Sequence, residues 1–352
     1  MALDDFRTLG RSGLRVSPLC LGAMTFGSGK GWTCDEATSV ELIRTYLDAG
    51  GNFIDTADIY TAGMSEEVLG RALAGSGVRD GVVLATKYTF GGVPGDINSR
   101  GNGRKNAFRA LEASLRRLHM DYVDLYWMHA WDTVTPVEEI VQTFDALIRQ
   151  GKIRYYGLSD VPAWLAAQIV DCARHNGMAA PIALQLEYSL IERVIEREHL
   201  PFAAAAGLGL CPWSPLAGGV LSGKYSRGET PDGGRLASVD TSQHRRLERD
   251  QTWAILDVLH AIADETGRTV AEIALNWAMH RYRSTSVIVG ATKLEQLTAN
   301  LAAGDFALST DQLERLDLAS RLEAVAPYSF FLPRRLDATM GRFEGFDPPA
   351  FG

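Results

Sequence analysis

Four residues of types that perform acid–base chemistry stand at or near the ends of successive short apolar runs. Asp55 closes one run, Tyr60 lies five residues further on, and Lys87 and His129 close the next two runs. A phenol is a proton donor, but its ordinary pKa of about 10 is too high for efficient work near neutrality. An adjacent ammonium favours the phenolate and lowers that pKa. We therefore predict that Tyr60 donates a proton and that Asp55 keeps Lys87 charged. His129 would then orient a substrate carbonyl.

Each residue also has a simpler interpretation. A lysine at a strand end is as often a surface or salt-bridging residue, and a single histidine is more often a satisfied core residue than a catalyst. Asp58 is a competing acid in the same stretch, but its neighbours in the sequence give it no partner, so a role in a turn is favoured. The combination of residues at successive strand ends carries the catalytic hypothesis.

The elements that must position these residues are eight short apolar runs, which alternate with amphipathic stretches. This alternation is typical of parallel βαβ units. The expected strands are residues 19–21, 52–54, 82–85, 122–127, 153–157, 182–186, 209–212 and 285–289. Eight units predict an α/β fold that closes into a single (β/α)8 TIM barrel, as one domain over residues 1–352. Chemistry in such barrels lies at the carboxyl ends of the strands, where the four residues stand.

Helix boundaries are also marked. Thr135, Thr269 and Thr292 each precede a glutamate by three residues, a pattern that satisfies exposed backbone donors at a helix start. Gly50 and Gly151 stand where helices should end. The spacing of Phe108, Leu111, Leu115 and Leu118, and of Ile140, Phe144 and Leu147, predicts helices that pack one face on the sheet.

Three kinds of segment fall outside the repeat. Residues 6–9 and 14–18 predict a β-hairpin that plugs one end of the barrel. Residues 91–104 and 218–245 predict long loops, and an irregular tail is expected from about 324 to 352. Loops of this length in a compact domain are usually functional.

Composition limits the function classes. A net charge of −8 argues against nucleic acid as a partner, because binding phosphates normally needs a clustered basic surface. No apolar run approaches the roughly 20 residues of a membrane helix and the start lacks a signal pattern, so we expect a cytoplasmic protein with no membrane partner. The sequence leaves room for a homo-oligomer. Cys20, Cys34, Cys172 and Cys211 lack CxxC spacing, which predicts reduced cysteines and no metal, with Cys20 and Cys211 buried.

Several segments resemble the aldo-keto reductases, and the resemblance spans nearly the whole chain. Its anchors, in the family's order, are residues 51–60 (GNFIDTADIY), 65–67 (SEE), 85–87 (ATK) and 121–129 (DYVDLYWMH). The resemblance implies that Asp55, Tyr60, Lys87 and His129 form a catalytic tetrad. The context of residues 159–164 (SDVPAW) is similar to the aryl-alcohol dehydrogenase-like branch. The family commonly has asparagine where this chain has Asp160, which accepts hydrogen bonds but does not donate them.

The resemblance also implies a dinucleotide bound without a Rossmann domain. Residues 151–159, 185–189, 212–216 and 290–293 are similar to the family's cofactor-binding elements, and residues 27–31 (GSGKG) do not form a GxGxxG motif. By resemblance, Trp213 stacks on the nicotinamide, while Ser159, Asp160 and Gln185 hold its carboxamide. The expected cofactor-binding residues are Gly22, Met24, Asp55, Ser159, Asp160, Gln185, Trp213, Ser214, Leu216, Gly218, Lys224, Gly290, Thr292, Lys293, Gln296 and Asn300.

The identity of the cofactor depends on a cation for the 2′-phosphate. Phosphates are expected beneath residues 218–225 and at the helix that begins at Thr292, whose free N–H groups suit anions. Lys293 favours NADPH, with NADH as the alternative. In the simpler interpretation, Thr292 only caps the helix and Lys293 is solvated.

Aromatic residues on the loops indicate the kind of substrate. Trp32, Phe90 and Trp131, together with Phe26 and the tail residues Tyr328, Phe330 and Phe331, are candidates to line the entrance. They favour an apolar or aromatic aldehyde or ketone, although each could instead anchor a loop.

Three functions compete on these observations. The favoured one is reversible, NADPH-dependent reduction of aldehydes or ketones to alcohols, with Tyr60 as the general acid. The alternative is a nicotinamide-sensing regulatory or scaffold subunit with slow turnover, similar to potassium-channel β-subunits. A barrel hydrolase that uses Asp55 and a second carboxylate is a third, but it leaves Lys87, Tyr60 and Trp213 without a role.

Overall fold

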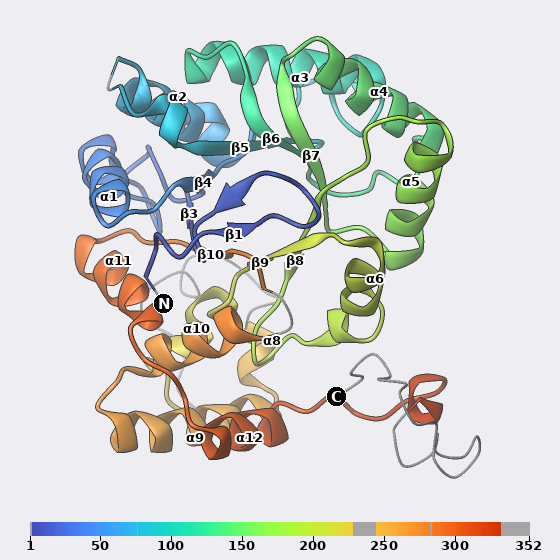
Figure 1. Ribbon diagram of the computed structural model, residues 1–352. Coiled ribbons are helices and arrows are strands. Elements are labelled where there is room, and N and C mark those ends of the chain that lie inside the picture. The colour runs from blue at the N-terminus through green and yellow to red at the C-terminus, as the bar shows by residue number, and fades with distance from the viewer. Residues whose placement is uncertain (1, 76, 228–243, 282–283, 332–352) are drawn as a thin grey trace.

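Eight parallel strands form the centre of the computed structural model, which describes residues 2–75, 77–227, 244–281 and 284–331. Their order is β10-β3-β4-β5-β6-β7-β8-β9. The strands are β3 (Leu19–Gly22), β4 (Phe53–Asp55), β5 (Val83–Tyr88), β6 (Val123–Met128), β7 (Ile153–Ser159), β8 (Ala183–Glu187), β9 (Gly209–Trp213) and β10 (Val287–Val289). The edges meet where the N–H of Thr285 donates to the carbonyl of Leu210 at 2.8 Å. All eight predicted strands are present, and the predicted barrel is confirmed (Figure 1).

The helices surround the barrel (Figure 1). They are α1 (Glu36–Asp48), α2 (Met64–Leu73), α3 (Arg104–Leu118), α4 (Val137–Arg149), α5 (Ala163–His175), α6 (His199–Ala206), α8 (His244–Leu247), α9 (Asp250–Thr266), α10 (Val270–His280), α11 (Leu294–Leu301) and α12 (Thr310–Ala319). The predicted apolar faces of α3 and α4 are buried, with Phe108 only partly so, and they pack in the layer between helices and sheet.

Some of the predicted helix boundaries are confirmed. Thr269 caps α10 in a capping box with Glu272, as the pattern predicts. Gly50 and Gly151 follow the ends of α1 and α4 with φ of 89° and 71°, a left-handed conformation that glycine adopts without a steric cost.

The other two predicted capping boxes are wrong. Pro136 occupies the position before α4, and the hydroxyl of Thr135 donates to Asp132 at 2.6 Å instead. At α11 the N–H and hydroxyl of Thr292 both donate to the side chain of Gln296, so a residue four positions on replaces the expected glutamate. In both cases a side chain three or four residues away takes the proton of the threonine hydroxyl.

The predicted hairpin is confirmed and closes the amino end of the barrel (Figure 1). It consists of β1 (Arg7–Thr8) and β2 (Arg15–Val16). Leu9 is fully buried in the cluster that fills the barrel interior around Trp127. At Gly10, with φ of 63°, a Cβ would lie 2.3 Å from the carbonyl oxygen of Ile182, so only glycine permits this close approach.

The long segments and the cysteines behave partly as expected. Residues 91–103 contain only a short 3-10 helix (Ile97–Ser99), whereas 228–243 and the tail from 332 onward lie outside the described residues. Cys20 and Cys211 are buried and free, as predicted. Within the described ranges, no cluster of side chains suits a metal ion, and no helix is both long and apolar enough to cross a bilayer.

Candidate active site

Strained backbone concentrates at the carboxyl ends of the strands. Among the described residues, the non-glycine residues with positive φ are Thr61, Ala62, Thr89, His119, Thr133, Asp160, Ser214 and Ala217. All except His119 follow the carboxyl end of β4, β5, β6, β7 or β9. Such conformations persist only where the surroundings enforce them, and they cluster at functional sites. This face, opposite the hairpin, is therefore the candidate active site.

Lys87 is the centre of the predicted catalytic group. Its side chain is fully buried, and its Nζ donates to Asp55, to the carbonyl of Thr56 at 2.9 Å and to the hydroxyl oxygen of Tyr60 at 3.2 Å. These contacts arise because β4 and β5 are neighbours in register, with Ile54 opposite Leu84. All three protons of the ammonium are used, so its position and charge are fixed.

The electrostatics of this group differ from the prediction in one respect. Burial opposes the charge of Lys87, but Asp55 and Tyr60 outweigh it and hold the pKa of Lys87 above its ordinary value. Burial also raises the pKa of Tyr60, and Lys87 opposes that rise without cancelling it. Lys87 therefore acts in the predicted direction, but the phenol remains protonated near neutrality. A protonated phenol is the form that donates.

His129 follows β6 and completes the group. Its backbone N–H donates to the carbonyl of Tyr88 at 3.0 Å, and its ring packs edge-on against Tyr60 and Phe90, with centroids 5.8 and 4.9 Å apart. Burial, and then the charge of Lys87, lower the pKa of His129 to about 2. The imidazole is therefore neutral. Its buried Nδ1 has no hydrogen-bond partner among the described residues.

Asp58 stays apart from this group. Its backbone N–H donates to the carbonyl of Lys87 at 3.1 Å, which anchors the turn that leads to Tyr60. Its Oδ1 is buried without a partner in the described chain, and burial together with the nearby Glu66 raises the pKa of Asp58 to about 7. These contacts favour the predicted turn role.

The residues predicted to hold a nicotinamide lie at the ends of β7, β8 and β9. Ser159 pairs in register with Gln185, whose Nε2 donates to Asp55 Oδ1 at 3.0 Å. The hydroxyl of Ser159 is buried and has no partner in the described part of the chain. Trp213 ends β9, and its indole N–H donates to Asp160 Oδ1 at 3.0 Å. An aromatic face, an orphaned hydroxyl and two polar side chains thus surround one site.

The turn after β9 is tightly wound and has a cation beside it. Ser214, Ala217, Gly218 and Gly219 all have positive φ, and the hydroxyl of Ser214 accepts from the N–H of Gly218 at 3.0 Å. The N–H groups of Ala217, Gly218 and Gly219 all donate within the turn, so Lys224 is the group that would attract an anion here. The ammonium of Lys224 lies beside Gly219, 3.5 Å from where a Cβ would be. The residues present therefore fit a dinucleotide, with Leu216 at the start of this turn.

The remaining predicted cofactor residues lie on the neighbouring loops. Gly22 ends β3 opposite Asp55, and Met24 is half-buried just after it. Asn300 is buried and its Nδ2 donates to the carbonyl of Gly290 at 3.3 Å. Lys293 is exposed at the start of α11 beside Thr292, whereas Gln296 occupies the polar groups of Thr292.

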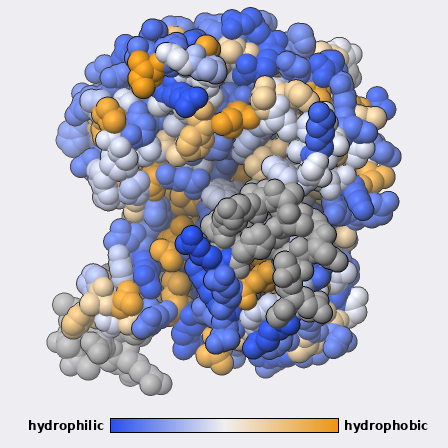
Figure 2. Space-filling model, turned by 180° about the vertical axis from the view of Figure 1, so that it is seen from behind, coloured by the Kyte–Doolittle hydropathy of each residue, from blue (hydrophilic) through white to orange (hydrophobic). Residues whose placement is uncertain are grey.

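Of the aromatic residues predicted at the entrance, Phe26 is wrong, because it is fully buried in the core. Phe90 is half exposed and contacts His129, so it lies at the site. Trp131 packs edge-on against Trp164, with ring centroids 5.3 Å apart, and Trp32 is partly buried in the loop after β3. Figure 2 views this face, on which apolar side chains are scattered among polar ones.

The expectation that tail aromatics line the entrance is wrong for the described part of the tail. Tyr328 donates to Glu198 at 2.5 Å, and its ring lies under Arg197. The tail therefore lies beside α6, outside the ring of helices (Figure 1).

Two contacts escaped the sequence analysis. Arg246 of α8 forms an ion pair of 2.7 Å with Glu187, and Asp160 bonds the indole of Trp213. The sequence could have placed Glu187 near the site, because it lies two residues after Gln185 and therefore points to the same side of the strand. Nothing local in the sequence indicated Arg246, which lies 59 residues away.

The fold and the site together define a barrel enzyme equipped for proton transfer at the carboxyl ends of its strands. Residues 18–321 match the Aldo/keto reductase family, and the chain belongs to that family.

Its relatives include catalysts and a channel subunit. Norsolorinic acid reductase of Aspergillus flavus is 36% identical over 91% of this chain and 81% of its own length. Aryl-alcohol dehydrogenase (NADP+) of Phanerodontia chrysosporium is 33% identical over 91% and 86%. A probable voltage-gated potassium channel subunit beta of Oryza sativa subsp. japonica is 40% identical over 86% and 91%.

Proposed function

We propose that this protein reduces aldehydes or ketones to alcohols with NADPH, reversibly, and that Tyr60 is the general acid. The observation that carries the proposal is the hydrogen bond of 3.2 Å from the buried ammonium of Lys87 to the Tyr60 hydroxyl oxygen. Because that oxygen accepts from Lys87, its own proton points elsewhere and is available to a ligand. When bound, NADPH supplies a hydride to the carbonyl carbon.

Proton transfer follows from the same contacts. As negative charge develops on the carbonyl oxygen, Tyr60 donates its proton to that oxygen, and the resulting phenolate is stabilised by Lys87. Asp55 keeps Lys87 charged throughout. Neutral His129 orients the carbonyl by a hydrogen bond rather than by charge, because its pKa lies far below neutrality.

The cofactor assignment rests on the residues around β7, β8 and β9. Trp213 provides a face for the nicotinamide, and Ser159 has an unused hydroxyl for the carboxamide. The ammonium of Lys224, beside Gly219 in the turn after β9, suits the pyrophosphate. Exposed Lys293 favours NADPH over NADH, since it can pair with a 2′-phosphate.

An apolar or aromatic carbonyl compound is the proposed substrate. Phe90 supports this class because its ring lies against His129, where the carbonyl would be held. The name of the aryl-alcohol dehydrogenase relative agrees with an aromatic substrate.

The test is loss of nicotinamide absorbance with an activated aromatic aldehyde, using wild-type protein and Tyr60→Phe, each with NADPH and with NADH. Rapid loss with wild type, abolished in the variant and faster with NADPH, is expected. Absence of cofactor binding would contradict the proposal.

The second candidate function is a nicotinamide-sensing subunit. It is favoured by the identity of 40% to a probable potassium channel subunit beta. A sensor would bind NADPH tightly and turn over slowly with every carbonyl compound tried. Steady-state turnover beside the NADPH dissociation constant separates the two functions.

A further inference from the structure

Asp160 places a carboxylate without a cationic partner beside the indole of Trp213. The neighbouring charges are paired: Lys87 with Asp55, and Glu187 with Arg246. No ion pair among the described residues includes Asp160. Its contact on this side is the indole N–H of Trp213, at 3.0 Å.

The backbone fixes this carboxylate. Asp160 follows β7 with φ of 44°, a left-handed conformation that aspartate tolerates better than most residues. Its N–H donates to the carbonyl of Gln185 at 3.2 Å. The hydrogen bond to Trp213 therefore crosses the end of β8, and a ring laid on the indole lies within a few ångström of a negative charge.

Two charged groups, Glu187 and Lys87, influence Asp160 in addition to its hydrogen bond with Trp213. Its side chain reaches solvent through the open mouth but is otherwise surrounded by protein, and this burial raises its pKa to about 6. Glu187 acts in the same direction, and Lys87 opposes it. Above that pH the carboxylate is ionised, and Arg246 is engaged by Glu187.

We propose that Asp160 stabilises positive charge on the nicotinamide, and so makes the site bind NADP+ more tightly than NADPH. The inference rests on the proposed function, in which the nicotinamide stacks on Trp213. The reduced ring is neutral and the oxidised ring is a cation. When NADPH gives a hydride to the carbonyl carbon, two electrons leave the ring and the carbonyl oxygen takes the proton of Tyr60. Asp160 therefore stabilises the charge that develops on the ring during reduction.

Asp160→Asn isolates the charge from the indole contact. The amide oxygen of asparagine still accepts the N–H of Trp213, so the ring keeps its support while the charge is lost. Asp160→Ala removes both. Asp171→Asn is the matched control, because it removes one negative charge from the exposed side of α5, far from the site.

The experiment is equilibrium titration of each protein with NADP+ and with NADPH at pH 8, followed by quenching of tryptophan fluorescence. We expect Asp160→Asn to raise the Kd for NADP+ roughly tenfold. This is less than an unscreened charge pair would give, because solvent around the exposed Asp160 side chain screens the interaction. The Kd for NADPH should stay within about twofold, because its ring carries no charge for Asp160 to stabilise. Asp171→Asn should change neither value.

Equal changes in both dissociation constants of Asp160→Asn, or no change in either, would overturn the inference. Failure of the wild-type protein to bind either nucleotide would instead overturn the proposed function. The two failures are therefore distinguishable.

Discussion

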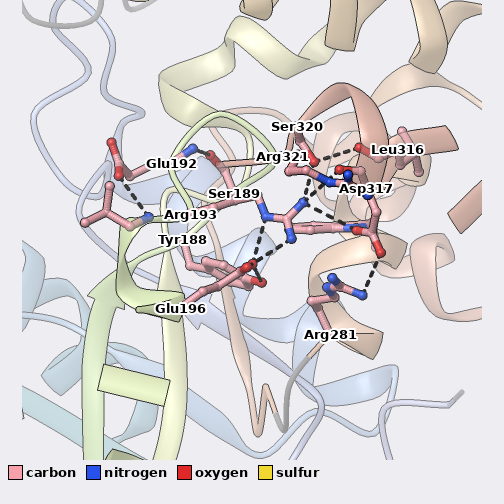
Figure 3. A network of polar contacts seen from close by, with 12 residues as sticks. Tyr188, Ser189, Glu192, Arg193, Glu196, Arg281, Leu316, Asp317, Ser320 and Arg321 are labelled. Atoms are coloured by element: carbon pink, nitrogen blue, oxygen red, sulfur yellow. Dashed lines mark hydrogen bonds and ion pairs between the residues drawn. The ribbon is translucent and has the colours of Figure 1, made fainter. Parts of the chain in front are cut away.

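Two buried charge networks of this barrel can be compared, the one around Lys87 and the one around Arg193. Arg193 lies in the loop after β8 and forms an ion pair of 2.8 Å with Glu196, which also accepts from Tyr188 at 2.6 Å. Its Nη1 donates to Ser320 at 2.6 Å and lies 3.4 Å from Asp317, which also pairs with Arg281 at 2.7 Å (Figure 3). This network joins the β8 loop to α10 and α12.

The networks differ in what their outermost members can still do. Around Arg193, each charge faces an opposite charge and each hydroxyl that contacts it is also held. Around Lys87, the cation is fully used, but the proton of Tyr60, the Nδ1 of His129 and the hydroxyl of Ser159 remain for a ligand. A buried ion network becomes a reactive site when it leaves such groups unpaired at the carboxyl ends of the strands.

The largest effect should come from Tyr60→Phe. Loss of the proton donor should lower kcat for carbonyl reduction by about 10³-fold, within the range for general acid catalysis. The Kd for NADPH and the melting temperature should change little, because only one hydrogen bond from Lys87 is lost. A variant that keeps a large fraction of wild-type kcat would contradict Tyr60 as the acid.

Arg193→Met should have the opposite effect: it should lower the stability of the protein and leave kcat nearly unchanged. It leaves Glu196 buried without its cation, which typically costs about 3–5 kcal/mol in the free energy of unfolding. Urea denaturation measures this loss, and kcat of the folded fraction should stay near wild type. Catalytic loss larger than the loss of folded protein would show that the network also shapes the site.

Asp58→Asn tests how a buried carboxyl outside both networks makes the free energy of unfolding depend on pH. Asp58 has a pKa of about 7 in the folded protein against an ordinary value of 3.8, so folding favours its protonated form. Wild-type stability is therefore lost progressively as pH rises from about 4 to 7. At pH 8 the variant should be more stable by about 1–3 kcal/mol, and at pH 4 nearly equal. Thermal melts across this range test the sign.

The smallest effect is the pH dependence of nucleotide preference. As pH falls through about 6, Asp160 takes up a proton and wild type should lose its preference for NADP+. Taking the ratio of the two dissociation constants cancels titration of the 2′-phosphate, which both nucleotides share. The same ratio should be flat in Asp160→Asn, and a parallel slope in the variant would assign the titration to another group.

The barrel and the convergence of its site residues could be predicted from local sequence patterns. Strand and helix periodicity predicted the barrel, and parallel strands place their carboxyl ends on one face, so Asp55, Lys87 and His129 were predicted to converge. The hairpin and the capping box at Thr269 are similarly local. These features depend on residues close together in the chain, and for that reason the pattern was sufficient.

The tertiary structure decided what depends on distant partners and on burial. Arg193 meets Asp317 across 124 residues, and Asp160 meets Trp213 across 53. Thr135 and Thr292 bond to Asp132 and Gln296, only three and four residues away, so those two errors came from choosing between local partners and not from distant ones. The net pKa shift of Tyr60 reversed because burial outweighs Lys87. Spacing in the sequence identifies which charges can meet, but the desolvation that sets their strength exists only once the barrel has closed around them.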